Sequence, residues 1–181
     1  MNLDSETRLV EAARNGHLES FAALYEHYYN GMVALAYSML ADLHAAEDAA
    51  QESFAIACAK LWELRRKDRF GAWLAAICRN VVRNMLRAKG RTATLNLQQP
   101  PESCDKYECD CDAIRRAVWK LRATDRQVVM LRYYDNMSYM QIASVLDISI
   151  QAVKGRLNRA KRKIAKDLKQ SGFTPDDYGM P

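Results

Sequence analysis

The residues best suited to chemistry form a basic stretch near the end of the sequence. Residues 149–170 contain eight Lys or Arg residues and one acid, Asp167. Cations of this kind hold nucleic-acid phosphates, and amides or guanidinium groups hydrogen-bond to base edges. The alternative is that this stretch forms the solvated face of an ordinary surface helix, but such a face usually carries both positive and negative side chains. We therefore expect this stretch to bind DNA, with these residues as its candidate contacts: Ser149, Gln151, Lys154, Arg156, Arg159 and Lys161.

Two helices are expected to position these side chains, one over residues 138–146 and one over residues 149–170. Their inward stripes are Ile142, Ala143 and Leu146 in the first helix, and Val153, Leu157 and Ile164 in the second. Asp147 and Ile148 supply the turn, and Ser138 and Ser149 are the expected N-caps, as is Thr124 for the preceding helix. Two short helices that cross over a small core form the helix-turn-helix motif, whose second helix enters the DNA major groove.

A second basic block lies over residues 65–91, which contain nine bases and one acid, Asp68. Two basic blocks in one chain predict two places where phosphates are engaged. The candidate contacts in this block are Arg65, Arg66, Arg69, Asn80, Arg83, Asn84 and Arg87. Two aromatic residues in the block, Phe70 and Trp73, have two possible roles, DNA contact or core packing, and for Trp73 we favour the core. Residues 1–64 are acidic instead, with ten acids and three bases.

The fold class expected from these patterns is all-α, with two small helical domains joined by a flexible linker. Helical periodicity predicts four helices over about 5–15, 18–40, 44–64 and 70–88, and four more over about 112–121, 125–134, 138–146 and 149–170. Among the expected inward residues are Leu18 in the second helix and Ala55, Cys58 and Trp62 in the third. The domain boundaries follow as 1–89, a linker at 90–111, 112–170, and a tail at 171–181, since Pro100-Pro101 ends helices.

The composition, 49% hydrophobic and 27% charged residues, is that of a folded globular protein. No apolar run approaches the length of a membrane span and the N-terminus does not resemble a signal peptide, so we expect a cytoplasmic protein with reduced cysteines. Cys58 and Cys78 are expected to be buried. Three more thiols in the acidic linker, Cys104, Cys109 and Cys111, could bind zinc or sense redox state. Because these thiols form no CxxC pair and have no nearby His, we favour the interpretation that they have no metal-binding or redox role.

With these residues in view, the chain resembles the extracytoplasmic-function sigma factors, the small members of the sigma-70 family. The segment Ala46-Glu-Asp-Ala-Ala-Gln-Glu-Ser-Phe54 is similar to the family signature Asp-Ala-Glu-Asp-x-x-Gln-Glu-x-Phe. Phe70-Gly-Ala-Trp-Leu-Ala-Ala-Ile-Cys-Arg-Asn80 is similar to Phe-x-x-Trp-Leu-x-x-Ile-Ala-Arg-Asn, and the segments Leu121–Gln127 and Tyr139–Ala160 follow the family pattern. The resemblance covers nearly the whole chain, from about Glu19 to Leu168.

The resemblance implies a transcription initiation factor without catalytic activity or cofactor. Its implied partners are the bacterial RNA polymerase core, promoter DNA and an anti-sigma factor. The basic block 65–91 would then read the −10 element, with the loop near Arg65–Phe70 taking a flipped base, and the helix over 149–170 would read the −35 element. The polymerase would grip an acidic and amide face made by Glu47, Asp48, Gln51 and Glu52.

The sequence departs from the family pattern at three places. Ala45 replaces the usual Asp before Ala-Glu-Asp, which weakens the acidic face. Asp147 stands where Gly is common in the turn, but Asp tolerates the left-handed conformation, so the turn should survive. The third departure is Arg122-Ala-Thr-Asp125, which replaces the frequent Pro-Glu start.

Two rival functions remain at this stage. A helix-turn-helix regulator with an unrelated helical sensor domain predicts tight binding to duplex DNA without polymerase. A helical nucleic-acid enzyme is disfavoured, because the sequence has no carboxylate cluster, His-rich set or phosphate-binding Gly loop.

Overall fold

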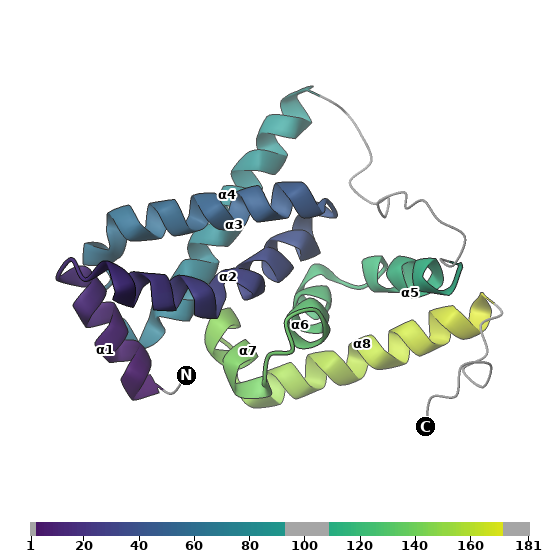
Figure 1. Cartoon of the computed structure of the whole chain (residues 1–181). Helices are drawn as coiled ribbons and strands as arrows, with labels where there is room; N and C mark the ends of the chain where they lie inside the picture. Colours follow the sequence, from purple (N-terminus) through teal and green to yellow (C-terminus); the bar gives the residue numbers. More distant parts are fainter. Residues whose placement is uncertain (1–2, 93–108, 172–181) are drawn as a thin grey trace.

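The computed structural model describes residues 3–92 and 109–171, and all regular elements in these ranges are helical (Figure 1). The first range contains α1 (Leu3–Arg14), α2 (Leu18–Leu40), α3 (Leu43–Lys60), the 3-10 turns η1 (Leu61–Glu63) and η2 (Lys67–Arg69), and α4 (Phe70–Thr92). The second range contains α5 (Cys109–Trp119), α6 (Ala123–Tyr133), α7 (Tyr139–Leu146) and α8 (Ile150–Gln170). The predicted all-α class with two helical units is therefore confirmed. α4 continues to Thr92, past the expected end at Ala88, and α5 begins three residues earlier than expected.

Side-chain caps explain where several helices begin. The Asp42 carboxylate accepts a hydrogen bond from the Ala45 backbone N–H at 3.0 Å and starts α3. Ser138 and Gln141 form a reciprocal capping box at the start of α7, and the predicted N-cap Ser138 is thus confirmed. The predicted cap Thr124 is wrong. α6 begins at Ala123, so Thr124 already lies inside the helix and Arg122 is the N-cap residue.

The turn of the helix-turn-helix forms as expected. Asp147 adopts the left-handed conformation, with φ 54° and ψ 50°, and ends α7. Ser149 then caps α8 by accepting a hydrogen bond from the Ala152 N–H at 3.1 Å. An Asp is among the few non-Gly residues that adopt this conformation at modest cost, so the departure from Gly leaves the turn intact.

The core of the front unit is built around α2, which α1, α3 and α4 all contact. Leu24, Met32 and Leu35 of α2 are fully buried. The start of α4 lies close to α2 because position 71 is a glycine; a Cβ there would lie 2.9 Å from the Tyr28 ring. Phe70 is also fully buried and packs against Tyr28, with ring centroids 5.6 Å apart, so its role is core packing. Trp73 is half-buried against the same core, as favoured above.

The two helical units pack against each other, α6 on α2 and α7 on α4 (Figure 1). Gly31 leaves a notch in α2 that admits Met137, whose Cε would lie 2.4 Å from a Cβ at position 31. Arg126 of α6 donates from Nε to the Ser38 carbonyl oxygen at 2.7 Å. Tyr37 lies edge-on to Trp119, with centroids 5.8 Å apart. One continuous apolar core therefore joins both units.

Four residues expected to face the core are on the surface instead: Leu18, Ala55, Cys58 and Trp62. Leu18 is the first residue of α2 and precedes the part of the helix that the bundle covers. α3 is rich in Ala on every side, so periodicity could not select its buried face. α3 ends at Lys60 and a 3-10 turn follows it. Leu61, four residues after the buried Ala57, is buried, and Trp62, four residues after the exposed Cys58, is exposed. Cys78 is buried as predicted, and burial raises the pKa of its thiol to about 11.

Candidate nucleic-acid interface

The candidate DNA-reading helix α8 has one buried and one exposed face. Val153, Leu157 and Ala160 are buried against the other helices of the rear unit, as predicted for the first two. Gln151 and Lys154 are exposed in the first turn and a half of the helix. The N-terminal part of such a helix is the part that reaches base edges in helix-turn-helix proteins.

Three other predicted contacts of α8 are half-buried or already have a partner within the protein. Arg156 is only half exposed, at the edge of the packed face. Arg159 is exposed and pairs with Asp125 of α6, with Nη2 and Oδ1 3.3 Å apart. The Ser149 hydroxyl oxygen accepts the capping hydrogen bond from the Ala152 N–H. Ser149 can therefore contact a phosphate by donating its O–H hydrogen.

Two residues on the exposed face were missed by the sequence reasoning, Asn158 and Arg162. They follow Gln151 by seven and eleven residues, and this spacing places all three on one side of a helix. Both side chains are exposed. The register that starts at Gln151 was the signal that could have found them, whereas the position along the helix, on which the prediction depended, also admitted Arg156 and Lys161 at the edges of the face.

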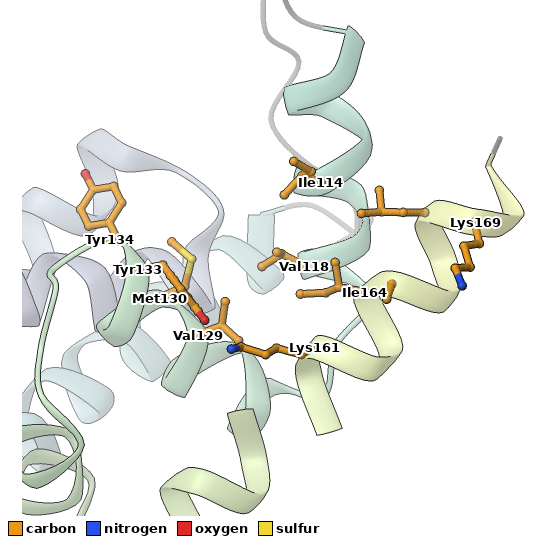
Figure 2. A pocket seen from close by; sticks show the side chains of 11 residues that line it. Ile114, Val118, Val129, Met130, Tyr133, Tyr134, Lys161, Ile164 and Lys169 are labelled. Carbon is orange, nitrogen blue, oxygen red and sulfur yellow. The ribbon is translucent and has the colours of Figure 1, made fainter. Parts of the chain in front are cut away.

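Lys161 borders an apolar pocket between α5, α6 and α8 (Figure 2). The pocket has a volume of about 510 Å³, and Lys161 and Lys169 mark the two ends of its α8 side. Its lining is otherwise almost entirely apolar or aromatic: Ile114, Val118, Val129, Met130, Tyr133, Tyr134, Ile164, Ala165 and Leu168. Lys161 therefore lies beside a different surface from Gln151, on the flank of α8.

The loop before α4 holds its three predicted arginine contacts in three different ways. Arg65 is exposed. Arg66 forms a two-pronged contact with Asp68, with Nη2 and Oδ2 2.6 Å apart, and this guanidinium holds the pKa of the carboxyl below its ordinary value. Arg69 pairs with Asp147, which lies in the turn of the rear unit. One predicted −10 contact is thus engaged by the helix-turn-helix.

The exposed face of α4 carries the remaining residues of the second basic block. Asn80, Arg83, Asn84 and Arg87 are all exposed, and their spacing of three, one and three residues places them on one side of the helix. Arg83 donates from Nη1 to the Asn80 side-chain oxygen at 3.0 Å. Two amides that alternate with two guanidinium groups combine groups that read bases with groups that hold phosphates.

The predicted acidic face lies on α3. Asp48, Gln51 and Glu52 are exposed. Glu47 is half-buried, and one of its oxygens lies 3.8 Å from Nδ1 of His44. The structure therefore brings the four residues together on one helix, with Glu47 at the edge of the face.

The described ranges contain no cluster of three or more His, Cys, Asp or Glu residues with metal-binding geometry. The linker thiols predicted as weak metal or redox candidates lie outside the described side chains: Cys104, Cys109 and Cys111. Across residues 3–92 and 109–171, none of the helices combines the length and apolar character needed to span a bilayer.

Two family models match this chain in the order of its two helical units. The model described as Sigma-70 region 2 matches residues 24–92, and the model described as Sigma-70, region 4 matches residues 111–164. Among curated proteins, the ECF RNA polymerase sigma factor SigW of Bacillus subtilis is 25% identical over 178 residues, covering 88% of this chain and 95% of its own.

Solved structures share the fold. CnrH, in its complex with the cytosolic domain of CnrY, matches with a TM-score of 0.65 and 24% identity, over 92% of this chain and 98% of its own. The sigma factor RpoE of Bartonella quintana, solved with the anti-sigma factor NepR, matches with a TM-score of 0.60 and 23% identity, over 83% of this chain and 98% of its own. Region 2 and region 4 together cover more than half of the sequence, and the chain belongs to the sigma-70 family of transcription initiation factors, in its extracytoplasmic-function group.

Proposed function

We propose that the chain binds the bacterial RNA polymerase core, directs it to promoters with a particular −35 and −10 pair, and helps to open the DNA. The observation that carries this proposal is the presence of two separate exposed stripes of cations and amides, one on α4 of region 2 and one on α8 of region 4. The proposed domains are 1–89 and 112–170, joined by 90–111. The proposed partners place its action in the bacterial cytoplasm.

The −35 element is assigned to α8 and the −10 element to α4 and its preceding loop. Gln151 and Asn158 supply amides at the exposed face of α8, with Lys154, Arg159 and Arg162 as phosphate contacts beside them. Opening a duplex costs a few kcal/mol per unpaired base. Stacking and cationic contacts to an unpaired strand supply about 1–3 kcal/mol per base, so a protein without ATP can favour the open form.

The polymerase is assigned to the acidic face of α3. Exposed carboxylates steer a basic partner and fix its orientation. An anti-sigma factor is a further proposed partner, since the similar RpoE of Bartonella quintana was solved with one.

The test is the affinity of labelled chain for purified core polymerase. The double change Asp48→Lys and Glu52→Lys should weaken binding at least tenfold, because it reverses charge on the proposed docking face. Glu26→Lys is the matched control, since it reverses an exposed acid on α2 outside that face. Tight, sequence-specific footprinting of duplex DNA by the chain alone, without any affinity for core polymerase, would favour a helix-turn-helix regulator instead.

A further inference from the structure

Asp125 is a buried acid beside the proposed DNA-reading helix, and the function proposed above gives it no role. It lies in the first turn of α6 and is 8% exposed. Its carboxylate Oδ1 lies 3.3 Å from Nη2 of Arg159 on α8. A carboxylate is costly to bury unless a cation or a hydrogen-bond donor meets it, so the Arg159 guanidinium helps to offset this cost.

The two ends of this ion pair differ in their exposure. The Asp125 side chain is 11% exposed, whereas the Arg159 side chain is 60% exposed. The carboxylate is therefore held by the packing around it, and the guanidinium extends from it to the surface. An Arg side chain has five N–H donors, so the contact with Asp125 leaves most of them for DNA. The pair thus restrains a proposed DNA contact without using it up.

The Arg159 guanidinium reaches back over Gly155. Its Nη1 lies 3.8 Å from the point that a Cβ at position 155 would occupy. Side chains of an α-helix lean toward its N-terminus, and residues four apart are neighbours on its surface. Gln151, Gly155 and Arg159 follow one another at this spacing. The guanidinium therefore lies nearer than its own Cα to the part of α8 that reaches base edges in helix-turn-helix proteins.

We propose that Asp125 is a positioning residue for −35 recognition, and this inference rests on the function proposed above. Asp125 aims the Arg159 guanidinium toward the first turns of α8 and offsets part of its charge. A cation that is free to turn reaches a phosphate of any duplex. A cation held in one direction makes its contact only when α8 lies in one register on the DNA. Asp125 therefore lowers the affinity for other sequences and keeps the contact with the preferred one.

A purely structural role is the alternative, because an acid in the first turn of a helix stabilises that helix. Asp125 follows Arg122, the N-cap residue of α6, by three positions, and Arg122 makes no side-chain capping hydrogen bond. Loss of a structural residue would weaken binding to every DNA sequence alike. Loss of a positioning residue would weaken binding to the preferred sequence and strengthen binding to others. The two roles therefore predict opposite changes in the affinity for nonspecific DNA.

The experiment measures how the full chain, assembled with core polymerase, binds two labelled duplexes. One is a promoter fragment recovered by runoff transcription, and the other is the same fragment with a scrambled −35 sequence. Asp125→Asn keeps the shape of the side chain and removes its charge. It should raise the affinity for the scrambled fragment about threefold and lower that for the promoter fragment about twofold, as expected of one partly exposed ion pair. Binding to the scrambled fragment should also depend more steeply on salt, because the freed guanidinium releases a further counterion.

Two further variants separate this role from a change in net charge. Asp167→Asn is the matched control, since Asp167 is an acid of the rear unit that also pairs with a base, with its Oδ1 2.8 Å from Nζ of Lys120. Its affinities for both fragments should stay those of the unchanged chain. Arg159→Gln removes the positioned cation, so adding Asp125→Asn to it should leave the ratio of the two affinities unchanged. Thermal unfolding of each variant checks that it is folded at the temperature of the binding assay.

Each other result overturns the inference in its own way. If Asp125→Asn weakens binding to both fragments alike, Asp125 has only a structural role, and if it changes neither affinity, Asp125 does not position Arg159. An equal effect of Asp167→Asn would assign the change to net charge. A ratio that still falls in the Arg159→Gln chain would show that Asp125 does not act through Arg159. If the unchanged chain with core polymerase binds both fragments equally, the proposed promoter recognition fails and the inference fails with it.

Discussion

At the scale of single residues, the exposed face of α8 decides which side chains we propose as DNA contacts. Gln151, Asn158 and Arg162 form the outward row, while Arg156 and Lys161 lie at its edges. The N-terminal part of the outward row of a recognition helix reaches base edges, and the cations beside it and further along the helix reach the phosphate backbone. The cations of the sequence could be recognised without a structure, but which of them face outward depends on the packing of Val153, Leu157 and Ala160.

We predict that Asn158→Ala lowers the affinity of the polymerase-bound chain for its preferred −35 sequence about tenfold, because it removes one base contact worth about 1–3 kcal/mol. Lys161→Ala should change this affinity less than threefold. The measurement is a titration of labelled promoter fragments, with a fragment of scrambled −35 sequence to separate base reading from phosphate binding. Equal losses for both variants, or a larger loss for Lys161→Ala, would contradict the assignment.

Glu6 makes a second prediction at this scale, one about pH. Its carboxylate is buried and accepts hydrogen bonds from the Tyr28 hydroxyl and the Gly71 N–H, but Oε1 has no partner in the described part of the chain. Desolvation outweighs these hydrogen bonds and raises the pKa of Glu6 above its ordinary value. The folded state therefore binds the Glu6 proton more tightly than the unfolded state. The resulting stabilisation is present below the unfolded pKa and is lost as pH rises through the folded pKa.

We expect Glu6→Gln to increase the free energy of unfolding at about pH 8, because a neutral amide replaces a buried charge. The difference between the variant and the unchanged chain should shrink as pH falls through the raised pKa of Glu6, because Glu6 itself then takes up a proton. Urea unfolding at several pH values measures this difference. A difference that is independent of pH would show that the Glu6 charge is not costly in the folded state.

At the scale of helices, caps and periodicity predicted most of the fold. The bounds of α2 and the caps Ser138 and Ser149 could be read from the sequence, because each depends on contacts between near neighbours in the chain. The exposure of Cys58 and Trp62 could not. An Ala-rich helix fits either face against a neighbour, and the 3-10 turn that follows α3 is set by tertiary contacts such as that of Arg14.

The capping box of α7 gives a prediction at this scale. Ser138→Ala should destabilise the chain by about 1 kcal/mol, because it leaves the Gln141 N–H without its side-chain acceptor. Ser138→Asp should retain most of the stability, since Asp is an equally good N-cap. Thermal unfolding followed by circular dichroism measures both variants. A loss for Ser138→Asp as large as that for Ser138→Ala would contradict a capping role.

At the scale of the whole molecule, the two units that we propose to read DNA are packed together. Arg69 of region 2 pairs with Asp147 of region 4, and α7 lies against α4. Elements at −35 and −10 are separated by about 85 Å of duplex at ~3.4 Å per base pair. The sixteen residues from 93 to 108 can extend to about 55 Å at most. Reading both elements therefore requires the two units to separate from the arrangement in Figure 1.

We predict that Gly31→Leu opens the molecule, because the new side chain fills the notch that Met137 occupies. The radius of gyration should rise by several Å from the value of about 16 Å expected for a compact chain of this length. Gly90→Leu is the matched control, since it gives the same gain in helix propensity and nothing lies within 4 Å of a Cβ at position 90. Small-angle X-ray scattering distinguishes the two variants, and an unchanged radius for Gly31→Leu would contradict the role of the notch.

Runoff transcription with the purified chain and bacterial core polymerase on a library of genomic fragments measures promoter-directed initiation itself. We expect start sites that share one −35 and −10 pair. We also expect these transcripts to be lost when Gln151 and Asn158 of α8, or Asn80 and Asn84 of α4, are changed to Ala. Transcripts that do not depend on the added chain, or that survive both pairs of changes, would contradict it.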